Sequence, residues 1–116
     1  MDTKDGNIYL IANSGSNEYA IGYTYKQTSE SRIRDLQTGN SNKLMEVGFV
    51  HVDNVAKVVK MVKRYFFSKK IEGMWYDLDS DDVHNFRQIC LEKEKLVRLL
   101  MNNPFFNENY GKDINF

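Results

Sequence analysis

Short apolar segments alternate with polar turn sequences at the start of the chain. Asn7–Asn13 (NIYLIAN) and Glu18–Thr24 (EYAIGYT) are separated by SGSN, whose Gly15 is typical of a hairpin loop. Because successive strand residues point to opposite faces, each predicted strand divides into two sets. In the first, Ile8, Leu10 and Ala12 share one face, with Tyr9 and Ile11 on the other. In the second, Tyr19, Ile21 and Tyr23 share a side, with Ala20, Gly22 and Thr24 opposite. The pattern predicts a β-hairpin.

A short helix is predicted next, over the segment SESRIRDLQTG. Thr28 or Ser29 offers an N-cap, Glu30 suits the first turn, and Gly39 is typical of a residue that ends a helix. The segment Lys43–Val52 follows and is rich in valine, phenylalanine and methionine, which favours a third, mostly buried strand.

The most amphipathic segment of the chain is Val55–Lys69, which predicts a second helix with Asp53 or Asn54 as its cap. Its apolar stripe consists of Val55, Val58, Val59, Val62 and Phe66, and the largely opposite side carries Lys57, Lys60, Lys63 and Arg64. A turn at KKIEG and a short extended segment, MWYDL, come after it.

A long C-terminal helix is predicted over residues 79–101, capped by Asp79 or Ser80. Its apolar seam consists of Val83, Phe86, Cys90, Val97 and Leu100. Such a seam docks on its own domain or on a second copy of the chain, and the sequence leaves both open. Residues 102–116 form an asparagine- and aromatic-rich tail that either packs as an arm or is ordered by a partner.

These elements predict an α+β fold, in which a small, mostly antiparallel three-stranded sheet is flanked by helices in the order ββαβα. We expect one domain over residues 1–101, including the C-terminal helix, followed by the tail at 102–116. The 116 residues are 41% hydrophobic and 28% charged, enough for a modest core.

No segment is apolar enough to span a membrane, and the polar start does not resemble a signal peptide. With Cys90 as the one cysteine, we expect an intracellular protein in a reducing compartment.

The formal net charge of zero hides an uneven distribution. Residues 1–53 hold five basic and seven acidic groups, residues 54–70 hold six basic and none acidic, and residues 71–116 hold five and nine. The positive excess therefore lies within 17 residues, which either form a solvated helix face or contact an anionic partner. Lys69 and Lys70, the last two residues of this positive segment, lie at the end of the predicted second helix and just beyond it.

Four segments at suitable distances are similar to the GIY-YIG nuclease superfamily, and to its phage- and virus-rich DNA-binding branch in particular. They are NIY, AIG with a following Tyr-Thr, SRIRDLQTGN, and the closing GMWYDL, and they cover about residues 6–83. The resemblance implies phosphodiester cleavage with one divalent metal. It also implies a large DNA virus or phage as the natural source.

Carried over onto this chain, the first-strand tyrosine of the family is Tyr9 and the phosphate-holding arginine is Arg32. A guanidinium suits the negative charge of a phosphodiester transition state, and a hard cation such as Mg²⁺ requires a carboxylate. The metal-binding glutamate, however, falls on Val59, and a histidine common four residues later is Lys63. The sequence departs at three further motif positions, Asn7, Ala20 and Met74.

We therefore expect a catalytically degenerate module that needs no cofactor. It would bind the DNA or RNA backbone non-specifically or act as an interaction component of a larger assembly. The candidate nucleic-acid-binding residues are Tyr9, Arg32, Lys57, Lys60, Lys63 and Arg64. One alternative is an active Mg²⁺-dependent endonuclease with a displaced carboxylate, for which Glu46, Asp53, Glu72 and Asp77 are nearest. Another is a purely structural protein that associates with itself through the seam and the tail.

The remaining candidate residues favour structural roles. His51 and His84 lack metal-ligand spacing, and Cys90 on the apolar seam is expected to be a buried, inert thiol. Trp75 and Tyr76 are expected to fill the core or the sheet edge, although exposed aromatic rings could stack on bases.

Overall fold

A computed structural model describes residues 3–102 and contains one five-stranded antiparallel sheet. Its strands are β1 (Gly6–Asn13), β2 (Glu18–Thr24), β3 (Leu44–Val52), β4 (Lys70–Glu72) and β5 (Trp75–Asp77), in the spatial order β3-β1-β2-β5-β4. The predicted α+β class is confirmed, but the predicted count of three strands is wrong. The segments interpreted as a turn and a short extended piece form a β4–β5 hairpin that adds to the edge of β2.

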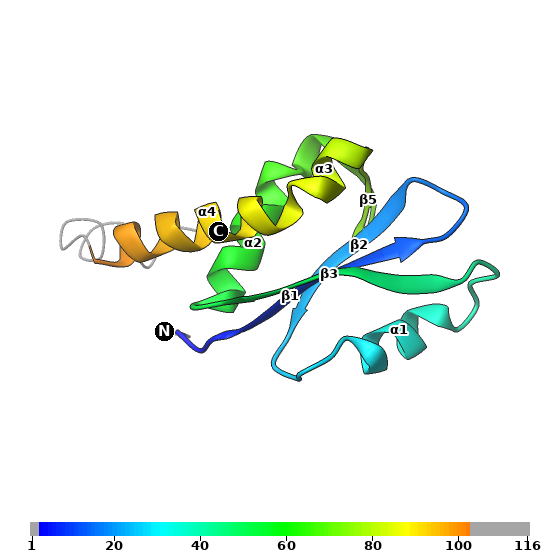
Figure 1. Cartoon of the computed structure of the whole chain (residues 1–116), viewed down its shortest axis with the longest axis horizontal. Helices are drawn as coiled ribbons and strands as arrows, with labels where there is room; N and C mark the ends of the chain where they lie inside the picture. The colour runs from blue at the N-terminus through cyan, green and yellow to red at the C-terminus, as the bar shows by residue number, and fades with distance from the viewer. Residues whose placement is uncertain (1–2, 103–116) are drawn as a thin grey trace.

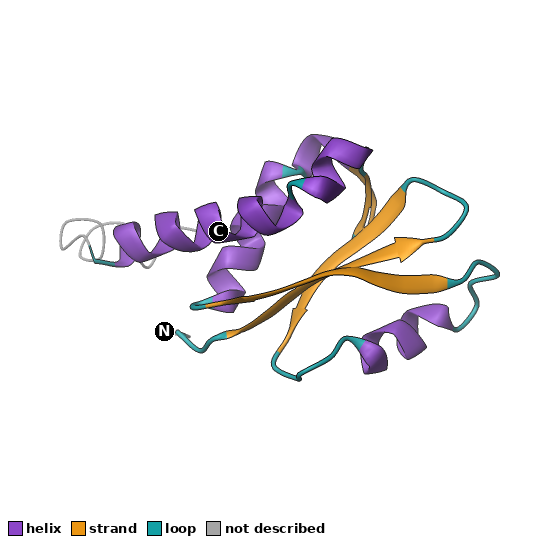
Figure 2. Ribbon diagram, viewed as in Figure 1, coloured by secondary structure: helices purple, strands orange, loops and turns teal. Residues whose placement is uncertain are grey.

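Helices cover both faces of the sheet (Figures 1 and 2). The helical segments are α1 (Glu30–Gln37), α2 (Val55–Tyr65), the 3₁₀ turn η1 (Phe67–Lys69), α3 (Ser80–His84) and α4 (Phe86–Met101). The helix α1 lies alone on one side, and α2, α3 and α4 lie together on the other (Figure 1). No helix in residues 3–102 is both long enough and apolar enough to cross a bilayer.

The alternation predicted for the hairpin separates two apolar clusters, one on each face of the sheet. On the α2 side, Ile8, Leu10 and Ile21 pack with the valine stripe of α2. On the α1 side, a smaller cluster is formed by Tyr9, Ile11, Ala20 and Leu44, against which Ile33 and Leu36 of α1 pack. The predicted faces of both strands are thus confirmed, and the sheet is covered on both sides.

The predicted seam of the C-terminal helix packs within its own chain. Val83, Phe86, Cys90 and Val97 belong to the cluster beneath α2 or pack against it, and Leu100 is half-buried. The seam therefore docks on its own domain, which is the first of the two alternatives that the sequence left open, and nothing in residues 3–102 supports association of two chains through it. The predicted helix 79–101 is also interrupted at Asn85 between α3 and α4. The tail at 103–116 lies outside the described residues.

Two cap predictions and one strand prediction need correction. Ser29 precedes α1 without capping it, because its hydroxyl donates to the Glu46 carboxylate at 2.6 Å. Asn54 precedes α2 in the left-handed conformation, with φ of 54°, and its side chain makes no cap hydrogen bond either. The strand β3 lies at the edge of the sheet and is not mostly buried, since Met45 and Val47 are 46% and 43% exposed.

Candidate functional site

Tyr9 is a fully buried tyrosine whose position depends on the strand opposite it. It lies directly across from Gly22 in the β1–β2 ladder, on the α1 side of the sheet. A Cβ atom at position 22 would lie 2.2 Å from the Tyr9 hydroxyl oxygen and 2.5 Å from its Cζ. The ring thus lies across the glycine backbone, and any larger residue there would displace it.

Arg32 comes from α1 and reaches the hydroxyl of the buried Tyr9. Its Nε donates a hydrogen bond of 3.0 Å to the Tyr9 hydroxyl oxygen, although the two residues are 23 positions apart. Arg32 is exposed and forms no salt bridge within residues 3–102. The structure therefore brings together the two residues carried over from the nuclease resemblance, with the guanidinium facing solvent on its other side.

Lys63 of α2 lies near Arg32 despite starting from the opposite face of the sheet. Burial lowers the pKa of Lys63, and the positive charges of Lys70 and then Arg32 lower it further. The charges of Lys70 and Arg32 thus both act on Lys63, and we call these three residues the cation cluster. In the described part of the chain, none of the three forms a salt bridge.

The approach from both faces is possible because the sheet is incomplete beside Gly22. The strand β5 pairs with β2 only over Glu18–Ala20, with one further hydrogen bond from Ile21 N to Met74 O. Among the strands that the structure describes, none pairs with the outer edge of β2 beyond that point. Side chains from α1 and α2 can therefore meet around this open edge.

The other basic candidates occupy different positions. Lys57, Lys60 and Arg64 lie on α2, with Lys60 exposed one turn before Lys63. Lys69, one residue before the cluster member Lys70, instead pairs with Asp82 and Asp79 at the start of α3. Lys70 was visible in the sequence only as part of the positive segment, because its place depends on where α2 stops and η1 turns the chain.

A metal ion does not fit the position that the nuclease resemblance assigns to it. Val59 is 2% exposed and packs in the cluster beneath the sheet, so it offers no ligand atom. Two of the four carboxylates considered as replacements already have partners, Glu46 with Ser29 and Asp53 with Arg98. Within residues 3–102, no group of three or more acidic, histidine or cysteine residues could hold a metal ion.

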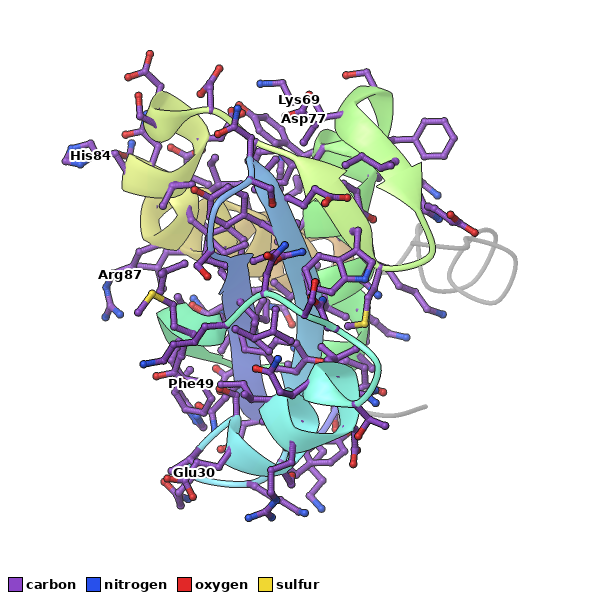
Figure 3. All side chains as sticks on the ribbon, turned by 90° about the vertical axis from the view of Figure 1, so that its right-hand side faces the viewer. Glu30, Phe49, Lys69, Asp77, His84 and Arg87 are labelled. Carbon is purple, nitrogen blue, oxygen red and sulfur yellow. The ribbon has the colours of Figure 1, made fainter. Side chains whose placement is uncertain are left out.

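A groove of about 560 Å³ lies between α1 and the β4–β5 hairpin. Figure 3 looks from the side on which α1 and the hairpin both face the viewer. Three of its lining side chains, Leu36, Met74 and Trp75, pack against the Tyr9 cluster. Two acidic residues, Glu18 and Glu72, also line this groove. We call it the Trp75 groove.

The remaining candidate residues are structural or lie elsewhere. Cys90 is fully buried, and burial raises the pKa of its thiol to about 12, as expected of an inert cysteine. His51 contacts Asn7 and Asp5 through its two ring nitrogens, and His84 is exposed at the end of α3 (Figure 3). Tyr76 is a core residue, as predicted, and its pKa is raised by burial.

Comparisons of the chain with family models, with curated proteins and with solved structures returned no match.

Proposed function

We propose that this chain binds the sugar-phosphate backbone of nucleic acid at the cation cluster, as a catalytically degenerate GIY-YIG-like module. The single observation that carries the proposal is that Arg32, which donates to the Tyr9 hydroxyl, and Lys70 both bring positive charge to Lys63, while none of the three forms a salt bridge within residues 3–102. Like charges at close range destabilise a fold, and a bound phosphate would relieve that cost. Arg32 would offer its solvent-facing N–H groups to phosphate oxygens in the forked geometry that guanidinium groups favour.

Two features support backbone binding over catalysis. The position that would carry a metal-binding glutamate is the buried Val59, so a hydrolytic metal has no anchor there. The cluster also comes from side chains whose charge does not distinguish one base from another, which favours binding without sequence preference.

The proposal is tested by the salt dependence of binding to labelled duplex and single-stranded oligonucleotides. We expect binding at low ionic strength that weakens linearly in a plot of log affinity against log salt. Changing both lysines of the cation cluster, Lys63 and Lys70, to glutamate should flatten that slope by roughly two for all sequences. Lys63→Glu places an acid next to Arg32 and Lys70, so the variant should stay folded.

Lys95→Glu supplies the matched control, because Lys95 is exposed on α4, on the opposite side of the sheet from α1. It makes the same charge change as each lysine substitution and should leave the slope almost unchanged. If neither type of oligonucleotide binds at low ionic strength, or if Lys95→Glu weakens binding as much as Lys63→Glu, the cation cluster is not a nucleic-acid site.

A further inference from the structure

The Trp75 groove lies within one nucleotide's reach of Arg32, a member of the cation cluster. Leu36 follows Arg32 by four residues on α1, which is about 6 Å along the helix axis. Trp75 pairs with Ala20, which lies two residues from Gly22 on the same face of β2, or about 7 Å along the strand. The groove therefore begins about one helical turn from the Tyr9–Arg32 contact, on the same side of the sheet.

The chemistry of the groove differs from that of the cluster. Leu36, Met74 and Trp75 give it apolar and aromatic walls, whereas Glu18 and Glu72 place carboxylates on it. Carboxylates repel phosphate, so the backbone itself is excluded from this space. They accept hydrogen bonds from amino groups, which nucleobases carry on their edges. An aromatic wall beside acceptors suits a flat, apolar ring with amino hydrogens.

Resting on the proposed function, we infer that the Trp75 groove receives one unstacked base of a single strand whose phosphate is held at the cation cluster. A base inside a duplex is stacked and paired, so it could enter only after leaving the helix. The preferred ligand is therefore single-stranded nucleic acid. Among pyrimidines, cytosine is preferred over thymine, because cytosine presents an N4 amino donor where thymine presents the O4 acceptor.

Trp75 is the chain's single tryptophan, so its fluorescence reports on the groove without any substitution. Oligo(dC) should quench that fluorescence on binding, whereas a duplex of mixed sequence should bind at low salt and leave it unchanged. Oligo(dC) should also bind about tenfold more tightly than oligo(dT), because both bases can stack on Trp75 but only cytosine offers an amino hydrogen to the carboxylates. Glu72→Gln, a change at an exposed residue, should reduce this preference without weakening duplex binding.

The outcomes separate the two proposals. Equal binding of single strands and duplex, with no change in Trp75 fluorescence, would overturn the groove assignment and leave backbone binding intact. Quenching by oligo(dT) as strong as that by oligo(dC), at equal affinity, would overturn the assigned role of the carboxylates. Absence of binding by every oligonucleotide would overturn the proposed function, and the groove assignment with it.

Discussion

Gly22 has no side chain, and this absence leaves the space that the Tyr9 ring occupies across the strand pair. The phenol ring occupies the space where a Cβ at position 22 would lie, and its hydroxyl then accepts the hydrogen bond from Arg32. One glycine thus determines both the packing on the α1 side and the position of a guanidinium at the surface.

Gly22→Ala should therefore lower stability and nucleic-acid affinity together. Displacing the Tyr9 ring from a buried cluster should cost roughly 2–3 kcal/mol of unfolding free energy, measured by denaturant titration. Gly15→Ala is the control, since Gly15 has φ of 83° but nothing within 4 Å of its Cβ position. It should cost about 1 kcal/mol and leave oligonucleotide binding intact. Equal losses in the two variants would show that the contact with Tyr9 is unimportant.

At this scale, strand alternation predicts which residues share a face with Tyr9, because the period of two depends only on the strand being formed. The closeness of Gly22 and Tyr9 needs the register of the hairpin as well, which the loop sequence does not fix. The sequence could not assign Lys70 to the site, because nothing in it distinguishes Lys70 from its neighbour Lys69. In the structure, Lys69 instead pairs with Asp79 and Asp82.

Among the helices, α3 shows how a short element is held by its first residues. Asp79 accepts a hydrogen bond from the backbone N–H of Asp82, and the Asp82 side chain accepts one from the backbone N–H of Asp79. Lys69 pairs with both carboxylates, which ties the end of η1 to the start of α3. The cap prediction at Asp79 is confirmed, because acidic residues at a helix start satisfy free N–H groups.

Asp79→Ala should lower the midpoint of thermal unfolding by roughly 4–8 °C near neutral pH. The pKa of Asp79 lies below its ordinary value, chiefly because the Asp82 N–H donates to it, with Lys69 contributing. A lowered folded-state pKa stabilises the fold above the unfolded-state pKa, and this contribution disappears as the pH falls through the folded value. The difference between the variant and the wild type should therefore shrink in strong acid.

Ser80→Ala, at the next and exposed position, is the control for Asp79→Ala and should leave the midpoint nearly unchanged. A difference between Asp79→Ala and the wild type that stayed constant from neutral to strongly acidic pH would contradict the assigned role of the carboxylate.

The sequence was less informative where residues that usually cap helices have other partners. Ser29 bonds to Glu46 across the chain and so anchors the start of α1 to β3. Such a bond depends on the meeting of segments 17 positions apart, which local patterns do not report. Likewise, β4 and β5 have three residues each, too few for alternation to distinguish a strand from a turn.

At the scale of the whole molecule, the sheet joins two apolar clusters that differ in size. The larger packs beneath α2 and α4, and the smaller lies beneath α1. Because β1 and β2 contribute alternate side chains to both clusters, neither can lose its packing without disturbing the other.

The two layers should consequently unfold together. Trp75 reports the α1 layer by fluorescence, and far-ultraviolet circular dichroism is dominated by the helices of the other layer. The two signals should give coincident transitions in denaturant, the expected behaviour of a single small domain. A fluorescence transition at lower denaturant than the dichroism transition would instead show that α1 and the β4–β5 hairpin come loose first.

The shortness of the β4–β5 hairpin allows charged side chains on the two faces of the sheet to interact electrostatically. A sheet covered by strands to its full width would insulate the charges on one face from those on the other. Here β5 stops pairing with β2 before Gly22. The positive charge of Arg32 therefore lowers the pKa of Lys63, although α1 and α2 lie on opposite faces of the sheet. A hairpin lengthened by two residues on each strand would screen them from each other and turn one shared surface into two separate ones.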